Sequence, residues 1–328
     1  MPPRSYQVKR LRLGFEKGAL FYAALNLRLF FLLLINPYDY LFANDLDTLP
    51  AAYLASRLRR KPLLYDSHEL FTEVPELVSR PRIQHFWLRI EQRILPHLKV
   101  MITVNESIAA IFKSNYSIPV NVVRNVPQRQ QQLNALSREE LNLKPTQKML
   151  IIQGSGLNVQ RGIEEAILAM ELIDDAVLFL VGDGDVIPSV KKIVATKNLQ
   201  EKVRFVGRLP YKQLLQYTAA ADLGLALDKP LSLNYALALP NKVFDYIQAQ
   251  TPFVTSPLVE IQKLIDRYDC GEVIQEVSPE ALAQKINTLC SNPERLAILK
   301  ENCKKAAAVE HWDGDKKVLA EVVGRVFI

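Results

Sequence analysis

Cysteine and histidine are scarce in this chain of 328 residues, which contains three cysteines and four histidines. The cysteines, Cys270, Cys290 and Cys303, are widely spaced and odd in number, so they form neither a CxxC metal motif nor a disulfide framework. Because histidines and cysteines do not cluster, we expect no structural zinc site and no resident metal. The cysteine pattern also favours a reducing compartment.

A secretion signal and a clear membrane span are missing as well. The first ten residues are polar and basic, and the long apolar run at residues 19–35 has no small-residue cleavage site behind it. That run has 17 residues with Asn26 and Arg28 near its centre, short of the ~20 apolar residues that a bilayer span requires. We therefore expect a buried or interfacial helix that is stopped by Pro37.

Acidic residues are few in the first part of the chain. Residues 1–130 contain 18 lysines and arginines against 10 aspartates and glutamates, a net charge of +8, so the remainder of a chain with total charge +6 carries −2. The only dense cluster of cations is at residues 57–61, and no nucleic-acid recognition motif accompanies it. We expect no nucleic-acid binding, but a cytoplasmic protein whose basic half makes peripheral contact with the inner face of the cytoplasmic membrane.

Length and composition indicate two globular domains. The hydrophobic share of 49% and the charged share of 23% are ordinary for soluble proteins, and the length suggests two domains of roughly 150 residues each. Apolar runs typical of strands alternate with helical stretches, which predicts an α/β fold of two doubly wound, Rossmann-like domains with parallel sheets. The predicted strands are residues 38–43, 62–65, 100–104, 120–123, 149–152, 177–181, 203–206, 223–227, 252–255 and 273–274.

The polar stretch at residues 128–132 has no apolar periodicity and is the predicted linker. Ser137 and Glu140 have the spacing of a capping box, which predicts a short helix after it. In doubly wound sheets ligands bind beyond the carboxyl ends of the strands, so the residues that follow each strand are candidates for a site. The expected domains are residues 1–130, residues 131–310 and a C-terminal helix, residues 311–328, that packs back on the first domain.

Three glycine-containing loops follow successive strands of the second domain. The first, residues 153–162, opens a helix; glycines such as Gly156 let the backbone approach a ligand, and Arg161 adds positive charge where the helix N-terminus already favours anions. A tight turn with a solvated arginine is the alternative. The other two loops contain Gly182 and Gly184, and Gly207, Arg208 and Leu209. The three loops share the sheet edge where a nucleotide would lie.

A further charged turn begins the helix at residues 239–246, with proline near its first turn. The N–H groups there, with Asn241 and Lys242, can face a diphosphate, and Asp245 one turn later can accept hydrogen bonds from a ribose diol. The alternative is an ordinary amphipathic helix with a surface lysine and aspartate. Beside the Arg161 loop, this turn predicts a nucleotide site.

These motifs resemble the retaining GT-B glycosyltransferases of family 4 over nearly the whole chain. The resemblance rests on Arg161-Gly162, Val181-Gly-Asp-Gly184, Val203-x-Phe-x-Gly207, Ala221-Asp222, Pro240-Asn-Lys-x-Phe-Asp-Tyr246 and residues 252–256. Residues 44–48 and 65–77 resemble the bacterial members that build surface polysaccharides or other glycoconjugates. The resemblance implies a GT-B fold with two domains facing a cleft, and a transferase of the EC 2.4 type.

The resemblance also implies the site chemistry. Arg161 and Lys242 would neutralise the diphosphate of a UDP- or GDP-sugar donor, Asp245 would hold its ribose, and the base would rest near residues 207–209. The acceptor would be lipid-linked or a polysaccharide, and the anomeric configuration would be retained. No bound divalent cation would be needed, because positive side chains and helix N-termini stabilise the departing diphosphate.

His68 follows a strand of the first domain, and the resemblance implies that it faces the transferred sugar. A structural histidine is the alternative. Asp66 and Glu69 can orient its ring or an acceptor hydroxyl, or cap the next helix, whereas Asp45 and Asp47 are interpreted as structural.

Two departures from the family pattern bear on activity. Members commonly have two glutamates eight positions apart, but here Leu237 and Asp245 stand at those positions, so the sugar contact is expected to pass to backbone N–H groups near residues 234–238. No strand and glycine loop precede the first helix, which predicts that a first βαβ unit is absent and the N-terminal domain incomplete. The alternatives are a catalytically inactive GT-B protein that binds a sugar nucleotide or a protein partner, and a GT-B sugar-nucleotide epimerase.

Overall fold

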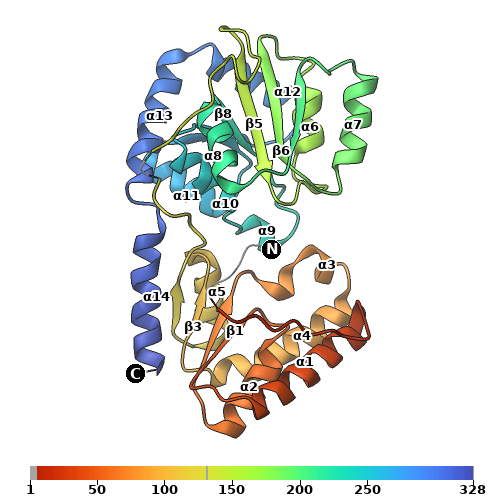
Figure 1. Cartoon of the computed structure of the whole chain (residues 1–328), viewed down its shortest axis with the longest axis vertical. Coiled ribbons are helices and arrows are strands. Elements are labelled where there is room, and N and C mark those ends of the chain that lie inside the picture. The colour runs from red at the N-terminus through yellow and green to blue at the C-terminus, as the bar shows by residue number, and fades with distance from the viewer. Residues whose placement is uncertain (1–5, 131, 328) are drawn as a thin grey trace. The chain divides into compact units, whose positions relative to one another are not determined.

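The computed structural model describes residues 6–130 and 132–327, which form two compact units (Figure 1). Unit 1 contains Met1–Val123 and Val318–Ile328, and unit 2 is the continuous segment Arg124–Lys317. The chain therefore passes between the units twice, and the first passage follows Val123, whereas the sequence placed the boundary after residue 130. Residue 131 of the predicted linker lies outside the described residues.

Unit 1 is built on a parallel sheet in the order β1-β2-β3-β4. Because each strand adds to the same edge and such crossovers are right-handed, the helices that connect the strands lie on one face. In chain order the elements are α1 (Gly18–Ile35), β1 (Leu41–Asn44), α2 (Leu49–Arg59), β2 (Leu63–Ser67), a 3₁₀ turn (Phe71–Glu73), α3 (Pro75–Val78), α4 (Pro81–Ile94), a 3₁₀ turn (Leu95–His97), β3 (Met101–Thr103), α5 (Glu106–Tyr116) and β4 (Val120–Val122).

The last helix, α14 (Trp312–Phe327), covers the other face of this sheet. From Val318 onward it belongs to unit 1, where Val322 is buried in one cluster with Leu64 of β2 and Ile102 of β3. Parallel sheets are normally covered on both faces. The C-terminal helix thus supplies the second layer of the unit 1 core.

Helix α1 lies on unit 1 without being part of its core. None of its residues is buried, although the helix packs along α2. The side chain of Asn26 ties it down by donating to the carbonyl of Asp47 and accepting from the N–H of Ala51. Of the two predictions for this segment, the buried helix is wrong and the interfacial helix stays a prediction. Within the described residues α1 is the one helix long and apolar enough to cross a membrane.

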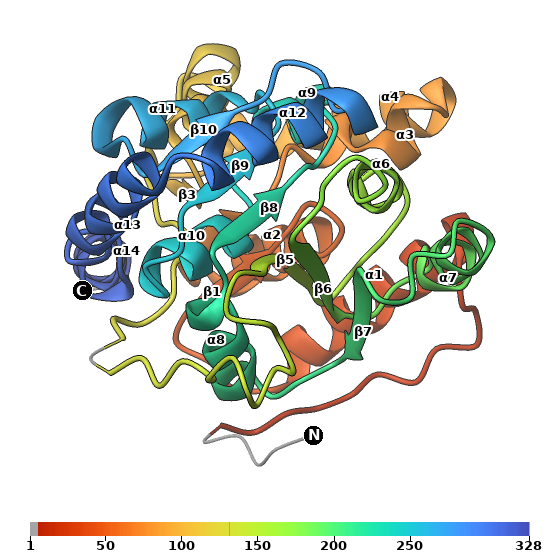
Figure 2. The same ribbon diagram turned by 90° about the horizontal axis from the view of Figure 1, so that it is seen from above.

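Unit 2 contains a parallel sheet in the order β10-β9-β8-β5-β6-β7, which Figure 2 shows strand by strand. Strands build outward from β5 first on one side and then on the other, the doubly wound arrangement. The elements are β5 (Lys148–Gly154), α6 (Ile163–Ala169), β6 (Ala176–Gly182), α7 (Ile187–Thr196), β7 (Val203–Gly207), α8 (Tyr211–Ala220), β8 (Leu223–Ala226), α9 (Leu233–Ala236), α10 (Asn241–Gln248), β9 (Phe253–Thr255), α11 (Val259–Tyr268), β10 (Gly271–Val273), α12 (Pro279–Cys290) and α13 (Pro293–Ala307).

Helices cover both faces of the unit 2 sheet (Figure 1). Alternate residues of β5 point to opposite faces, so Leu150 and Ile152 join the core under α6, α7 and α12, while Met149 and Ile151 join the core under α10, α11 and α13. Because the strands are parallel, the carboxyl ends of β5, β6 and β8 lie at one edge of the sheet, where a ligand is expected.

The predicted fold class is confirmed, since both units are α/β with parallel, Rossmann-like sheets. Every predicted strand is present, with ends within three residues of those expected. The prediction of a short helix after Ser137 is wrong. Ser137 and Glu140 do exchange the hydrogen bonds of a capping box, but the left-handed backbone of Asn142, with φ 48°, ends the segment after a single turn. Residues 6–40 of the described chain contain no strand, and the predicted loss of a first βαβ unit stays a prediction.

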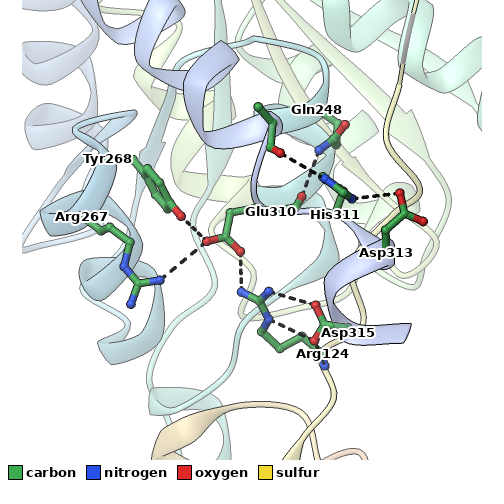
Figure 3. Close-up of polar contacts among 9 residues, drawn as sticks. Arg124, Gln248, Arg267, Tyr268, Glu310, His311, Asp313 and Asp315 are labelled. Atoms are coloured by element: carbon green, nitrogen blue, oxygen red, sulfur yellow. Dashed lines mark hydrogen bonds and ion pairs between the residues drawn. The ribbon is translucent and has the colours of Figure 1, made fainter. Parts of the chain in front are cut away.

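A buried ion cluster lies in unit 2 where the chain enters and leaves it (Figure 3). Arg124 donates from its backbone N–H to Asp315 at 2.7 Å and from Nη2 at 2.9 Å, and its Nη1 lies 2.5 Å from Glu310. The hydroxyl of Tyr268 donates to the other oxygen of Glu310, and the side chain of Gln248 donates to the Glu310 backbone carbonyl. Both carboxylates are at most 4% exposed, so Arg124, together with Arg267 at 3.7 Å from Glu310, offsets two charges that have almost no contact with water.

Candidate nucleotide-sugar site

A cavity of about 890 Å³ opens in unit 2 at the predicted edge of the sheet. Its walls come from the turn after β5 and from the starts of α8 and α10. Its volume is in the range of small-molecule sites. Polar and charged residues on the wall include Gln153, Ser155, Arg161, Tyr211, Asn241, Lys242 and Asp245, together with the backbone of Gly156.

The turn after β5 brings Arg161 to the cavity because of the glycine that follows it. Gly162 has a left-handed φ of 69°, and a Cβ at this position would lie 2.4 Å from the Cβ of Leu227. Only glycine permits this approach of the turn to the end of β8. Since Asp228 follows Leu227, the contact sets the Arg161 guanidinium beside the Asp228 carboxylate.

Asp228 is a buried anion shared by two cations of the cavity wall. Arg161 Nη1 lies 2.5 Å from its Oδ1, and Lys242 Nζ lies 2.8 Å from its Oδ2. Burial alone would raise the pKa of Asp228, but the charges of Lys242 and Arg161 outweigh it and hold that pKa below its usual range. The carboxylate stays ionised and keeps both cations together, with one positive charge left over for a ligand.

Helix α10 directs its N-terminus to the same cavity. Its N-cap residue, Pro240, makes no side-chain capping hydrogen bond. The Val243 N–H donates to the Pro240 carbonyl, whereas the N–H groups of Asn241 and Lys242 receive no acceptor from the cap side chain. Asn241 and Lys242, in the first turn, both line the cavity. The helix dipole and these amides favour an anion at the position that the two cations also face.

Asp245, one turn along α10, is held by a hydrogen-bond network. The Tyr211 hydroxyl donates to Asp245 Oδ1 at 2.7 Å, and Gln153 Nε2 donates to Oδ2 at 3.0 Å. The Thr218 hydroxyl lies 2.6 Å from Gln153 Oε1, which turns the amide nitrogen toward the carboxylate. Burial raises the pKa of Asp245, and the two hydrogen bonds lower it in part. Each carboxylate oxygen keeps a lone pair for a further donor.

Five residues predicted to bind the nucleotide lie outside the lining of this cavity: Gly182, Gly184, Gly207, Arg208 and Leu209. Gly182 and Gly184 support the glycine turn from behind, since a Cβ on them would lie 1.9 Å from the Gly154 carbonyl oxygen and 2.1 Å from that of Leu157. Arg208 Nη2 lies 3.5 Å from the carbonyl of Ser155, and Leu209 packs against the core. Contact of residues 207–209 with a base stays a prediction.

His68 belongs to unit 1, where two carboxylates hold its ring. Its Nδ1 lies 3.3 Å from Asp45 Oδ2, its Nε2 lies 3.1 Å from Asp66 Oδ2, and its backbone N–H donates to Asp45. Hydrogen bonds that the ring donates to Asp45 and then to Asp66 raise the pKa of His68 to about 10. The ring is therefore an imidazolium at neutral pH, with both N–H groups directed to carboxylates, and it cannot act as a general base. Asp45, interpreted as structural from the sequence, is its first partner.

Backbone N–H groups near residues 234–238 were expected to replace the missing glutamate. Those of Ala236, Leu237 and Ala238 donate to carbonyls of residues 232–235 and close the short helix α9. That of Tyr235 donates to the side chain of Ser232. These four groups are thus engaged and do not provide the expected sugar contact.

Sequence reasoning overlooked Asp228, Tyr211 and the role of Gln153. The sequence contained a signal for Asp228, because it lies two residues after a fully buried strand, at the end where ligands bind. No local sequence pattern indicated Tyr211 or Gln153, because their hydrogen bonds to Asp245 depend on how α8, β5 and α10 pack. The described residues contain no group of three or more His, Cys, Asp or Glu placed to hold a metal ion.

The geometry agrees with what sequence comparison finds. The sequence model of the family described as "Glycosyl transferases group 1" matches residues 135–306, more than half of the chain. The model described as "Glycosyltransferase Family 4" matches residues 2–127. The chain therefore belongs to the group 1 glycosyl transferases, and the predicted transferase class is confirmed. No curated protein sequence matches the chain.

Solved structures are similar over most of the chain. Sucrose-phosphate synthase from Thermosynechococcus elongatus has a TM-score of 0.73 at 18% identity, covering 94% of this chain and 77% of its own. HepE from Anabaena, solved with UDP-glucose, has a TM-score of 0.73 at 18% identity, covering 92% and 82%. WaaG, a glycosyltransferase involved in lipopolysaccharide biosynthesis, has a TM-score of 0.63 at 16% identity, covering 85% and 83%. At these identities the likeness establishes the GT-B fold.

Proposed function

We propose that this protein moves a sugar from a UDP- or GDP-sugar to a lipid-linked or polysaccharide acceptor, in the cytoplasm at the inner face of the cytoplasmic membrane. The observation that carries the proposal is the pair Arg161 and Lys242, held together at one cavity wall beside the N-terminus of α10. A diphosphate, with two or more negative charges, suits this combination of cations and amides. The UDP and UDP-glucose in the HepE structures support a nucleotide-sugar donor.

The cation pair acts on the leaving group. When the bond between the anomeric carbon and the diphosphate oxygen breaks, negative charge builds on the diphosphate, and Arg161, Lys242 and the α10 amides stabilise it. Asp228 holds both cations in place before the donor arrives, so little reorganisation accompanies the reaction. This is why we propose that no divalent cation is required.

Asp245 is the proposed ribose ligand. Tyr211 and Gln153 fix its carboxylate, and the remaining lone pairs accept from the ribose hydroxyls. Residues 207–209, which follow β7 next to the glycine turn, are proposed to hold the base.

His68 is proposed to face the transferred sugar as an imidazolium that Asp45 and Asp66 hold in place. We also propose retention of configuration. Both carboxylates at the donor site are engaged, Asp228 by cations and Asp245 by Tyr211 and Gln153, so neither is a free nucleophile for a double displacement. The retaining route that we propose without such a nucleophile is departure of the diphosphate and attack by the acceptor on the same face of the sugar.

The proposal is tested by donor turnover. Purified protein is incubated with UDP- and GDP-sugars and a glycolipid-containing membrane extract, with and without EDTA, and release of the nucleoside diphosphate is measured. Arg161→Ala and Lys242→Ala should each lower turnover by about 100-fold or more, the loss typical of removing one group that stabilises transition-state charge. EDTA should have no effect, and the product should keep the anomeric configuration of the donor by NMR.

Lys197→Ala is the matched control, because Lys197 pairs with Glu171 away from the cavity. It should leave turnover unchanged. Donor affinity that stays at the wild-type value in Arg161→Ala, measured by calorimetry, would contradict the site. Donor binding without any turnover or donor hydrolysis would favour the inactive GT-B protein, for which Leu237 in place of a glutamate is the motivating observation.

A further inference from the structure

Helix α1 carries an apolar stripe that nothing in unit 1 covers. The stripe consists of Leu20, Leu27, Phe31 and Ile35, each between 55% and 77% exposed. Their spacings, with the small residue Ala23 between the first two, are those of one helix face. Large apolar side chains in an unbroken row on the surface mark an interaction site more often than a plain solvated face.

Other faces of α1 are attached to unit 1. Asn26 bonds to the backbone on both sides of the α2 start, the ring of Tyr22 packs edge-on against Trp87 at 5.2 Å, and Arg59 of α2 donates to the carbonyl of Leu33. A helix held along its length in this way lies on the domain. To span a bilayer it would have to break these contacts, and at ~1.5 Å per residue it is also slightly short of the hydrocarbon thickness.

The charged side chains of the two helices are all positive, and the acid Asp39 pairs with Lys61, just after α2, at 3.6 Å. Neither α1 nor α2 contains an aspartate or glutamate, whereas Arg28, Arg57 and Arg59 lie on them and Arg60 and Lys61 follow directly. Helix α2 adds two further exposed leucines, Leu54 and Leu58. An apolar face bordered by cations is the composition of a helix that lies in the interface of an anionic membrane.

We propose that α1, with the exposed side of α2, is the surface by which this protein docks on anionic phospholipid, the apolar stripe entering the headgroup and acyl boundary and the arginines contacting phosphate. A second copy of the chain is a poorer occupant, because two such faces packed together would bring arginines against arginines with no acid on either helix. This inference rests on the membrane location in the proposed function, for which it names the surface and the lipid class, and it does not depend on donor binding.

The test is flotation of the full chain with vesicles of phosphatidylcholine alone or with roughly 30% phosphatidylglycerol, at low and high salt. We expect binding to the anionic vesicles that weakens with salt. Leu27→Asp/Phe31→Asp and, separately, Arg57→Gln/Arg60→Gln should each reduce the bound fraction at least tenfold. Leu172→Asp, a similarly exposed leucine of unit 2, is the matched control and should float like the wild type.

The affinity of the same variants for UDP and GDP, measured by calorimetry, should equal that of the wild type. This measurement separates a defect in membrane docking from a defect in the donor site. Circular dichroism checks folding, and Phe31→Trp offers a milder probe whose fluorescence should shift to the blue on adding anionic vesicles. The proposal is overturned by equal binding to both vesicle types, by no binding, or by resistance to carbonate extraction, which would mean a span. A dimer that Leu27→Asp/Phe31→Asp dissociates, without vesicle binding, would assign the stripe to a second copy.

Discussion

Asp228 is the residue on which the donor site depends most, although it lies behind the cavity wall and not on it. It is 4% exposed and pairs with both Arg161 and Lys242. It therefore has two opposing effects on a diphosphate: it keeps the cations in position, and it offsets one of their two charges. A substitution that removes the charge of Asp228 but keeps the shape of its side chain shows which effect is larger.

We predict that Asp228→Asn binds UDP or GDP roughly tenfold more tightly than the wild type and turns over donor more slowly. Its amide keeps the shape of the carboxylate but leaves the cation pair with two charges instead of one, and a unit charge within several ångströms is worth on the order of 1–3 kcal/mol at a partly buried site. Calorimetry and steady-state kinetics measure both quantities.

Glu201→Gln, at an exposed acid outside the lining of the cavity, is the control and should change neither. Weaker nucleotide binding by Asp228→Asn would show that positioning of the cations outweighs the offset of their charge.

At the scale of elements, α4 and α5 are joined by a buried polar contact. The hydroxyl of Tyr116 donates to Glu91 Oε1 at 2.5 Å, and Glu91 is 5% exposed. Burial raises the pKa of Glu91 to about 7, although the bond from Tyr116 lowers it in part. A carboxyl whose pKa is higher in the folded than in the unfolded chain stabilises the fold while protonated, below about pH 4.3, and that contribution is lost as pH rises through 7.

Glu91→Gln should therefore remove the part of the pH dependence of the free energy of unfolding that comes from Glu91. Glutamine keeps an acceptor for Tyr116 and does not ionise, so the variant should match the wild type at pH 4 and exceed its free energy of unfolding by up to about 3 kcal/mol at pH 8. Urea unfolding at the two pH values measures this. Glu76→Gln, at an exposed position of α3, should show no such difference; an equal effect of both variants would count against a buried, protonated Glu91.

The elements were largely predictable because their signals are local. The predicted strand at residues 203–206 forms β7, which differs from it by one residue, and α10 begins directly after Pro240 in the segment predicted as a helix. The predictions of local structure failed where a long-range contact or a single backbone angle determines the conformation. The Ser137 capping box is present, yet Asn142 ends the turn, and α9 takes up the amides that a sugar was expected to meet.

For the whole molecule, the Arg124 cluster (Figure 3) ties together the two segments by which the chain passes between its units. Arg124 is the first residue of unit 2, and Asp315 lies near its end, in the helix that continues into unit 1. Taking away one partner of a buried ion cluster leaves the others without compensation.

Arg124→Met should lower the free energy of unfolding by about 3–5 kcal/mol, because Asp315 remains as a buried, uncompensated charge and Glu310 is left with its longer ion pair with Arg267 at 3.7 Å. Thermal and urea unfolding measure the loss. Arg129→Met, at an exposed arginine nearby, should cost far less. The triple variant Arg124→Met/Glu310→Gln/Asp315→Asn should recover part of the loss, and equal stability of Arg124→Met and Arg129→Met would exclude the cluster as a structural requirement.

The sequence by itself determined the alternation of strands and helices, the turn that carries Arg161 and the start of α10 with Lys242, since apolar runs, glycines after strands and proline at a helix start act within a few residues. Only the tertiary structure decided the partners of the charged side chains. Arg161 meets Asp228 across 67 residues, and Arg124 meets Glu310 across 186. Such pairs leave no local pattern, because folding chooses them by which distant segments pack together and by the cost of burying either charge alone.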